Sequence, residues 1–236
     1  MQAVRQRILI TGASAGIGAE LAKQYAAAGR TLALCSRRLP VLDGAVTKRL
    51  DVTDPAAVKQ VFEEFREELG GLDRIIVNAG IAGGHRIGTG GEAENRATVA
   101  TNFLGALSQC EAALEIFRAQ NAGHLVVISS MAALRGLPGA VTTYAATKAA
   151  VSSLADGIRA DVSGTPIKVT TILPGYIRSE MNPRPGKLIA DTEPAVRAMV
   201  KAIEREPKKA YIPPWPWRAL APVLRHLPDS ILKRAT

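Results

Sequence analysis

Two side chains in the segment Tyr144-Ala-Ala-Thr-Lys148 are candidates for proton transfer. A phenol and an ammonium group four residues apart lie on one face of the helix that is predicted to open here. A free phenol has a pKa of about 10, and a neighbouring ammonium favours the phenolate and should lower that pKa. The same spacing is common in solvated surface pairs, so Tyr144 and Lys148 need support from other residues.

A glycine-rich turn near the start of the chain is the second chemical signal. The predicted strand Ile8–Ile10 runs into Thr11-Gly-Ala-Ser-Ala-Gly-Ile-Gly18, and a helix follows. Glycines allow a tight turn and let the backbone approach a pyrophosphate, whose charge meets the unsatisfied N–H groups of the helix. The spacing Gly-x3-Gly-x-Gly differs from the commoner Gly-x-Gly-x2-Gly fingerprint, and an ordinary turn with a helix cap would read similarly.

The elements that would position these residues alternate along the chain. Short apolar runs, many with β-branched residues, are separated by segments with helical spacing of apolar positions, which predicts an α/β fold with a doubly wound, mainly parallel sheet and helices on both faces. The predicted strands are Ile8–Ile10, Thr31–Cys35, Lys48–Leu50, Ile75–Val77, Leu125–Ile128 and Val169–Leu173. The predicted helices include Ala19–Ala28, Ala56–Leu69, Ala97–Ala119 and Ala145–Val162.

Composition sets the limits of this interpretation. The 236 residues are 47% apolar and 22% charged, which suits a single globular domain over residues 1–236. We expect a cytoplasmic protein, because the N-terminus has no apolar stretch of signal-peptide length and no run approaches a membrane span. The cysteines Cys35 and Cys110 stand far apart in apolar segments and are expected to be reduced and buried.

The charge of +9 does not choose a partner by itself. The basic residues are scattered and are not interleaved with aromatic residues, so we expect no nucleic-acid partner. The histidines His85, His124 and His226 have no Cys or carboxylate neighbours in the sequence, and we expect no metal site.

The motifs together resemble the short-chain dehydrogenase/reductase family. The glycine turn, the Tyr-x3-Lys pair and the Ser129-Ser130 dipeptide after the strand Leu125–Ile128 carry the resemblance, which runs from about Ile8 to Ile212. It implies a Rossmann-like fold and an oxidoreductase that moves hydride between a nicotinamide and a carbonyl or alcohol carbon. The catalytic residues that it implies are Asn102, Ser130, Tyr144 and Lys148.

The resemblance also implies a role for each residue. Tyr144 would give or take the proton that must accompany hydride transfer, and Lys148 would lower its pKa and hold the nicotinamide ribose. Ser130 would orient the substrate oxygen, and Asn102 would anchor a water-linked proton path. The interval from Ser130 to Tyr144 is one residue longer than the family pattern, so Ser129 stays an alternative to Ser130.

The residues after the second strand favour NADP(H). Ser36 stands where NAD-preferring relatives carry Asp, and the Arg37 guanidinium can form paired bonds to a 2′-phosphate, although two solvated arginines would look the same. By resemblance, Asp51-Val52 brackets the adenine, Asn78-Ala-Gly80 lies beneath the cofactor, and the Pro174-Gly175 segment contacts the nicotinamide. The implied cofactor-binding residues are Gly12, Ser14, Gly16, Ile17, Gly18, Ser36, Arg37, Arg38, Asp51, Val52, Asn78, Ala79, Gly80, Tyr144, Lys148, Pro174, Gly175, Ile177 and Ser179.

The remaining segments carry weaker signals. Residues 180–192 are the expected substrate lid, and residues 213–236 form a C-terminal extension; prolines exclude regular helix from Tyr211 to Trp217. The apolar stripe of the extension would pack against the body or a second subunit, or would make weak contact with a membrane surface. By analogy with relatives we expect a homo-oligomer, a dimer or tetramer, that reduces a ketone or aldehyde. The alternative is an NADP(H)-binding sensor or scaffold without turnover.

Overall fold

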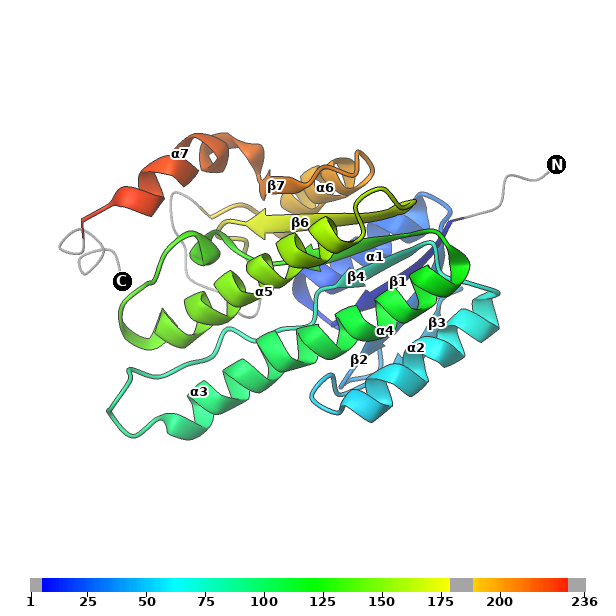
Figure 1. Ribbon diagram of the computed structural model, residues 1–236, viewed down its shortest axis with the longest axis horizontal. Coiled ribbons are helices and arrows are strands. Elements are labelled where there is room, and N and C mark those ends of the chain that lie inside the picture. The colour runs from blue at the N-terminus through cyan, green and yellow to red at the C-terminus, as the bar shows by residue number, and fades with distance from the viewer. Residues whose placement is uncertain (1–5, 179–188, 229–236) are drawn as a thin grey trace.

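The computed structural model describes residues 6–178 and 189–228 (Figure 1). Seven parallel strands form one sheet in the order β3-β2-β1-β4-β5-β6-β7. This arrangement confirms the predicted doubly wound α/β fold, in which the strand order reverses between β1 and β4. The strands are β1 (Arg7–Thr11), β2 (Thr31–Ser36), β3 (Val46–Arg49), β4 (Arg74–Val77), β5 (Gly123–Ile128), β6 (Ile167–Pro174) and β7 (Lys209–Ile212).

Helices cover both faces of the sheet (Figure 1). Successive strand residues point to opposite faces, so Ile8 and Ile10 join one core while Leu9 joins the other. Because both faces are buried, the strands read as continuous apolar runs. Helices α1 (Gly16–Ala27) and α6 (Thr192–Ile203) pack on the first face, and the second face is covered by α2 (Pro55–Leu69), α4 (Gly105–Gln120) and α5 (Thr142–Asp161).

The helix expected over Ala97–Ala119 starts earlier and is not uniform. It begins with α3 (Glu92–Val99), passes through a π-helical turn (Ala100–Leu104) and continues as α4. The π-helical turn contains Asn102, which is buried. π-Turns inside helices are rare and frequently occur at functional sites.

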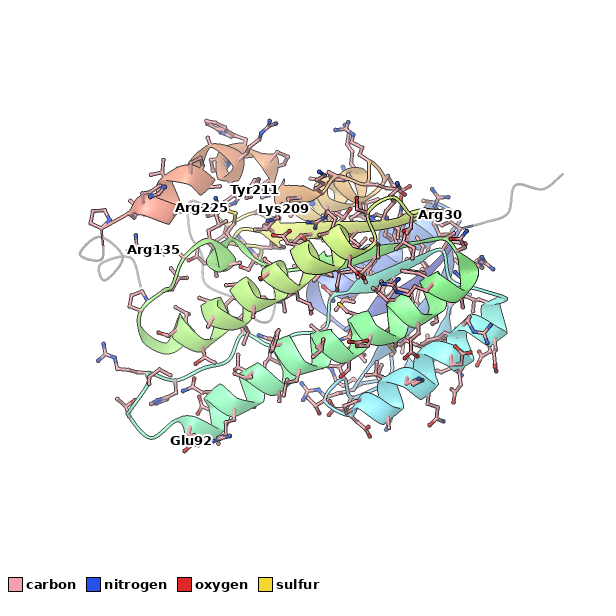
Figure 2. All side chains as sticks on the ribbon, in the orientation of Figure 1. Arg30, Glu92, Arg135, Lys209, Tyr211 and Arg225 are labelled. Atoms are coloured by element: carbon pink, nitrogen blue, oxygen red, sulfur yellow. The ribbon has the colours of Figure 1, made fainter. Side chains whose placement is uncertain are left out.

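The C-terminal part contains two elements that the sequence prediction missed, α6 and the edge strand β7. The last helix, α7 (Pro214–His226), packs on β7 and on the 3-10 turn η2 (Met131–Leu134). Tyr211 of β7 (Figure 2) borders the apolar cluster beneath α7. The backbone of Trp215 is non-helical (φ −104°, ψ 133°), so the prolines do interrupt the helix there, but Trp217 lies inside it, contrary to the prediction. None of the helices in the described parts of the chain has the length and apolar character to cross a bilayer.

Candidate active site

The turn after β1 has no room for side chains at Gly12 and Gly18. Gly12 and Gly16 adopt left-handed φ angles of 65° and 54°. A Cβ on Gly18 would lie 2.3 Å from the Gly12 carbonyl oxygen. The N-cap residue of α1 is Ala15, whose methyl side chain cannot cap the helix. The bare helix terminus and the close-packed glycines therefore fit a pyrophosphate, with Ser14 half-buried in the same turn.

Thr11 and Asn78 tie the ends of β1 and β4 together. The Asn78 side-chain amide donates to the Thr11 carbonyl at 2.8 Å. The backbone N–H groups of Asn78 and Ala79 donate to the Thr11 hydroxyl at 3.0 and 3.1 Å. The Asn78-Ala-Gly80 turn is thus fixed directly beside the glycine turn. The supporting role of Thr11 was not foreseen, although its position at the last residue of β1 is visible in the sequence.

The two arginines after β2 are exposed at the carboxyl end of the sheet. The Ser36 hydroxyl donates to the Arg38 carbonyl, which shapes this turn. Asp51 follows the neighbouring strand β3, and its carboxylate accepts hydrogen bonds from the Thr53 backbone N–H and hydroxyl. These hydrogen bonds, with the charge of Arg37, hold the pKa of Asp51 below its ordinary value. Arg37 and Asp51 are therefore close enough to interact at the expected adenosine end of the site.

Val52, the partner of Asp51 in the expected adenine contact, is buried under the long helix. A Cβ on Gly105, at the start of α4, would lie 2.9 Å from the Val52 side chain. Val52 therefore fixes the loop after β3 against α4. Ile17, on the other side of the glycine turn, packs against the core between α1 and the sheet.

Tyr144 and Lys148 lie in the first two turns of α5, as predicted. The Lys148 side-chain nitrogen is buried, donates to the Ile128 carbonyl at 3.0 Å and lies 5.9 Å from the centre of the Tyr144 ring. Burial lowers the pKa of Lys148 to about 8. Burial raises the pKa of Tyr144, and a hydrogen bond from Ser130 opposes this rise only in part. The expected lowering of the Tyr144 pKa by Lys148 is therefore wrong for the protein alone, because desolvation dominates.

The two serines after β5 have different environments. The Ser129 hydroxyl donates to the Lys148 carbonyl at 2.9 Å and lies 2.7 Å from the Ser152 hydroxyl, so its hydrogen is already engaged inside the core. The Ser130 hydroxyl is partly exposed and accepts from the Ala132 backbone N–H at 3.1 Å. Its hydrogen remains available for Tyr144 or for a bound oxygen. The geometry thus separates Ser130, which faces Tyr144, from Ser129, which supports α5.

Asn102 connects the π-helical turn to the loop after β4. Its side-chain amide donates to the Ile81 carbonyl and its side-chain oxygen accepts from the Ile81 N–H, both at 2.8 Å. A weaker contact of 3.5 Å joins it to the Thr147 hydroxyl on α5. A Cβ on Gly80 would lie 3.1 Å from the Asn102 oxygen and 3.6 Å from the Lys148 nitrogen. The side chain of Asn102 therefore holds the loop after β4 in place near the Lys148 nitrogen. Its role in a water-linked proton path stays a prediction.

The segment after β6 leaves the sheet beside the segment after β5, because these strands are parallel neighbours. Pro174 ends β6, and the Gly175 N–H donates to the Ile212 carbonyl at 2.8 Å. Ile177 is buried and pairs with Ala190 in an isolated bridge. Ser179 and residues 180–188 of the expected lid lie outside the described residues. Across the described ranges, no group of three His, Cys, Asp or Glu side chains could hold a metal ion.

The turns of the site follow the carboxyl ends of β1, β2, β3, β4, β5 and β6, and the helical residues Asn102, Tyr144 and Lys148 lie against the loops after β4 and β5. In Figure 1 the β6 arrow points towards the side where α7 and the start of α5 lie. This edge of a doubly wound sheet is where ligands bind in such folds. Two residues beside the site were not foreseen from the sequence. Thr147 contacts Asn102, and Trp217 packs against Gly175, a contact that follows only from the packing of α7.

Comparisons with known proteins identify the family of the chain. The short chain dehydrogenase family model matches residues 6–187. An uncharacterized oxidoreductase of Mycobacterium tuberculosis is 46% identical over an alignment of 245 residues. The alignment covers 98% of this chain and 97% of the relative.

Solved structures share the fold. A short-chain dehydrogenase from Streptomyces avermitilis has a TM-score of 0.83 at 24% identity, covering 99% of this chain and 96% of that one. A serine dehydrogenase complexed with NADP+ has a TM-score of 0.80 at 24% identity, covering 88% and 95%. From the matched segment and the relative, the chain belongs to the short-chain dehydrogenase family of oxidoreductases.

Proposed function

We propose that the chain is an NADP(H)-dependent carbonyl reductase in which Tyr144 supplies the proton. The observation that carries the proposal is the hydrogen bond between Ser130 and Tyr144 beside the buried amine of Lys148. A bound nicotinamide supplies or accepts the hydride. Ser130 would hold the carbonyl oxygen by turning its hydroxyl hydrogen from Tyr144 to that oxygen, and Tyr144 would protonate the oxygen as negative charge develops on it.

The protonation state of Tyr144 supports reduction as the favoured direction. Because burial raises its pKa, Tyr144 keeps its proton at neutral pH and can act as an acid without prior change. Oxidation of an alcohol would require the phenolate, which burial disfavours. Lys148 lies beside the ring and, while charged, stabilises the phenolate that forms when the proton leaves.

NADP(H) is proposed over NAD(H) because of the residues at the end of β2. An exposed guanidinium at Arg37 can pair with a 2′-phosphate, and Ser36 offers no carboxylate to repel it. The neighbouring Asp51 is already engaged by Thr53. The Asp51 carboxylate is thus held by hydrogen bonds from Thr53, and the charge of Arg37 offsets part of its negative charge.

The test is NADPH consumption against a panel of ketones and aldehydes, with Tyr144→Phe as the variant. Removing the acid should lower kcat by about 10²- to 10⁴-fold, while NADPH binding, followed by fluorescence, stays unchanged. Tyr25→Phe is the matched control, since Tyr25 is buried beside Arg74, at the amino-terminal ends of the strands and away from the site. This variant should keep full turnover. Undiminished turnover in Tyr144→Phe would reject the proposal, and NADPH binding without any turnover by the wild type would favour a sensor.

A further inference from the structure

Trp217 of α7 packs directly on the backbone that follows β6. A Cβ on Gly175 would lie 2.1 Å from Cε2 and Nε1 of the Trp217 indole, so only glycine permits this contact. The indole is buried, with 4% of its surface exposed, and its N–H finds no hydrogen-bond partner among the described residues. A large aromatic side chain is thus held against the turn by packing alone. The C-terminal helix is therefore part of the wall behind the Pro174-Gly175 turn.

The next residue, Tyr176, uses Trp217 as a support. Its ring centre lies 5.9 Å from that of Trp217 at an interplanar angle of 59°, a tilted geometry that aromatic pairs favour. The backbone on either side is fixed, because the Tyr176 carbonyl accepts from the Ala190 N–H at 2.9 Å and the Gly175 N–H is bonded to β7. Yet 54% of Tyr176 is exposed. It is an anchored aromatic ring with an open surface.

The position of Tyr176 relates it to the proposed proton donor. Strands β5 and β6 are neighbours, with Ile128 and Ile172 in register, so the chain leaves the same edge of the sheet at Ser130 and at Tyr176. Met131, which follows Ser130, packs in one apolar cluster with Trp217 and Leu173. Tyr176 is also close enough to Tyr144 to influence its ionisation. The open ring therefore borders the place where a carbonyl oxygen would meet Ser130 and Tyr144.

We propose that Tyr176, held in place by Trp217, is a wall of the substrate site and selects carbonyl compounds that carry an aryl or other flat conjugated group next to the carbonyl. The inference rests on the proposed function and adds the substrate class to it. A flat group can stack on the exposed ring or meet its edge, as aromatic pairs do. A saturated ring of the same size loses this contact. Gly175 is required for the arrangement, because any side chain there would displace Trp217.

The test compares acetophenone with cyclohexyl methyl ketone, two ketones of similar size that differ in the flat ring. The wild type, Tyr176→Phe and Tyr176→Leu are compared by the ratio of kcat/KM for the two ketones. We expect the ratio to fall about 3- to 10-fold in Tyr176→Leu, the range of a lost aromatic pair, and to stay unchanged in Tyr176→Phe. An unchanged ratio in Tyr176→Leu would overturn the inference, and so would an equal fall in Tyr176→Phe, because the hydroxyl and not the ring would then matter.

A binding measurement separates this inference from the proposed function. With NADP+ in place of NADPH the two ketones bind without reduction, and their Kd ratio is measured by saturation-transfer NMR in the same three proteins. Aryl-selective binding that is lost in Tyr176→Leu supports the aromatic wall even if the wild type reduces neither ketone. Turnover of both ketones with equal Kd ratios in all three proteins would leave the reductase standing and remove the wall. Melting temperatures of Tyr176→Leu and wild type exclude misfolding, since Tyr176 is largely exposed.

Discussion

The amine of Lys148 lies 5.9 Å from the centre of the Tyr144 ring, yet its hydrogen bond goes to the Ile128 carbonyl. Burial acts on both groups in the same sense, towards their neutral forms: it raises the pKa of Tyr144 and lowers that of Lys148 to about 8. The pair is thus poised with a protonated phenol and an amine that changes its charge just above neutral pH. The sequence spacing identified the partners but predicted the wrong direction for the phenol, because spacing does not measure desolvation.

The first prediction concerns pH. Lys148 is charged below its pKa of about 8, and its charge favours the phenolate that forms as Tyr144 releases its proton. We therefore expect kcat for NADPH-dependent reduction to be constant near neutral pH and to fall as the pH rises through about 8. The profile is measured from initial rates, and Lys148→Arg is the comparison, because a guanidinium stays charged over this range. A fall at the same pH in Lys148→Arg would show that another group is responsible.

The second prediction separates the two serines. Ser130→Ala removes the hydroxyl beside Tyr144 and should lower kcat by about 10²- to 10³-fold, as the loss of an oxyanion donor does. Ser129→Ala removes the bonds to Lys148 and Ser152 and should cost about 1–3 kcal/mol of folding free energy while keeping most of the activity. Urea unfolding and steady-state kinetics of both variants provide the test. A larger activity loss in Ser129→Ala than in Ser130→Ala would reverse the assignment.

The third prediction tests the cofactor preference. Arg37→Ala removes the guanidinium proposed to bind the 2′-phosphate, and charge-assisted bonds of this kind are worth about 1.5–3 kcal/mol. The Kd for NADPH should therefore rise about tenfold or more, and the Kd for NADH should not change. Arg118→Ala is the matched control, since Arg118 lies on α4 and pairs with Asp161. Equal effects of Arg37→Ala on both dinucleotides would place the 2′-phosphate elsewhere.

Most of the sheet could be predicted from the sequence because its strands are buried on both faces. The runs around Ile8, Leu34, Ile76 and Val126 are uniformly apolar and needed no tertiary information. The edge strand β7 gave no such signal, since Ile212 is the sole fully buried residue among its four. Helix α6 did carry a signal, with Val196, Met199 and Ile203 at helical spacing, and its omission was avoidable.

The site was predictable where a motif fixes a residue and not where packing decides. Gly12, Asn78, Tyr144 and Lys148 lie together because each follows or begins an element at one edge of the sheet. The wall formed by Trp217 depends on how α7 packs on β7 and against the turn after β6, which no local pattern specifies. The π-helical turn at Asn102 also depends on tertiary packing, because it places the Asn102 side chain against the loop after β4.

A buried polar network lies at the amino-terminal edge of the sheet, remote from the proposed site. The Arg74 Nε donates to His124 Nδ1 at 2.9 Å, and Arg74 also pairs with Glu204. Arg30 (Figure 2) pairs with Glu204 from outside at 3.4 Å. The Thr170 hydroxyl donates to a backbone carbonyl at 2.7 Å and so accepts from His124 Nε2 at 2.9 Å. These bonds require a neutral His124 with its hydrogen on Nε2.

The last prediction follows from this fixed tautomer. Burial and then the charge of Arg74 lower the pKa of His124 to about 3, against about 6.5 in the unfolded chain. Above pH 6.5 His124 is neutral in both the folded and the unfolded chain, so it adds no pH dependence to the free energy of unfolding. As the pH falls below 6.5, only the unfolded chain takes up the proton. The free energy of unfolding therefore falls progressively down to about pH 3.

The loss between pH 6.5 and 5 should be about 2 kcal/mol, measured by urea unfolding at each pH. His124→Gln, which cannot take up the proton, should be less stable at pH 7 but should lose much less stability over this interval, whereas His226→Gln at the exposed end of α7 should follow the wild type. Carboxylates contribute mainly below pH 5, because their ordinary pKa values are about 4. Parallel slopes for the wild type and His124→Gln would therefore mean that His124 does not carry the pH dependence.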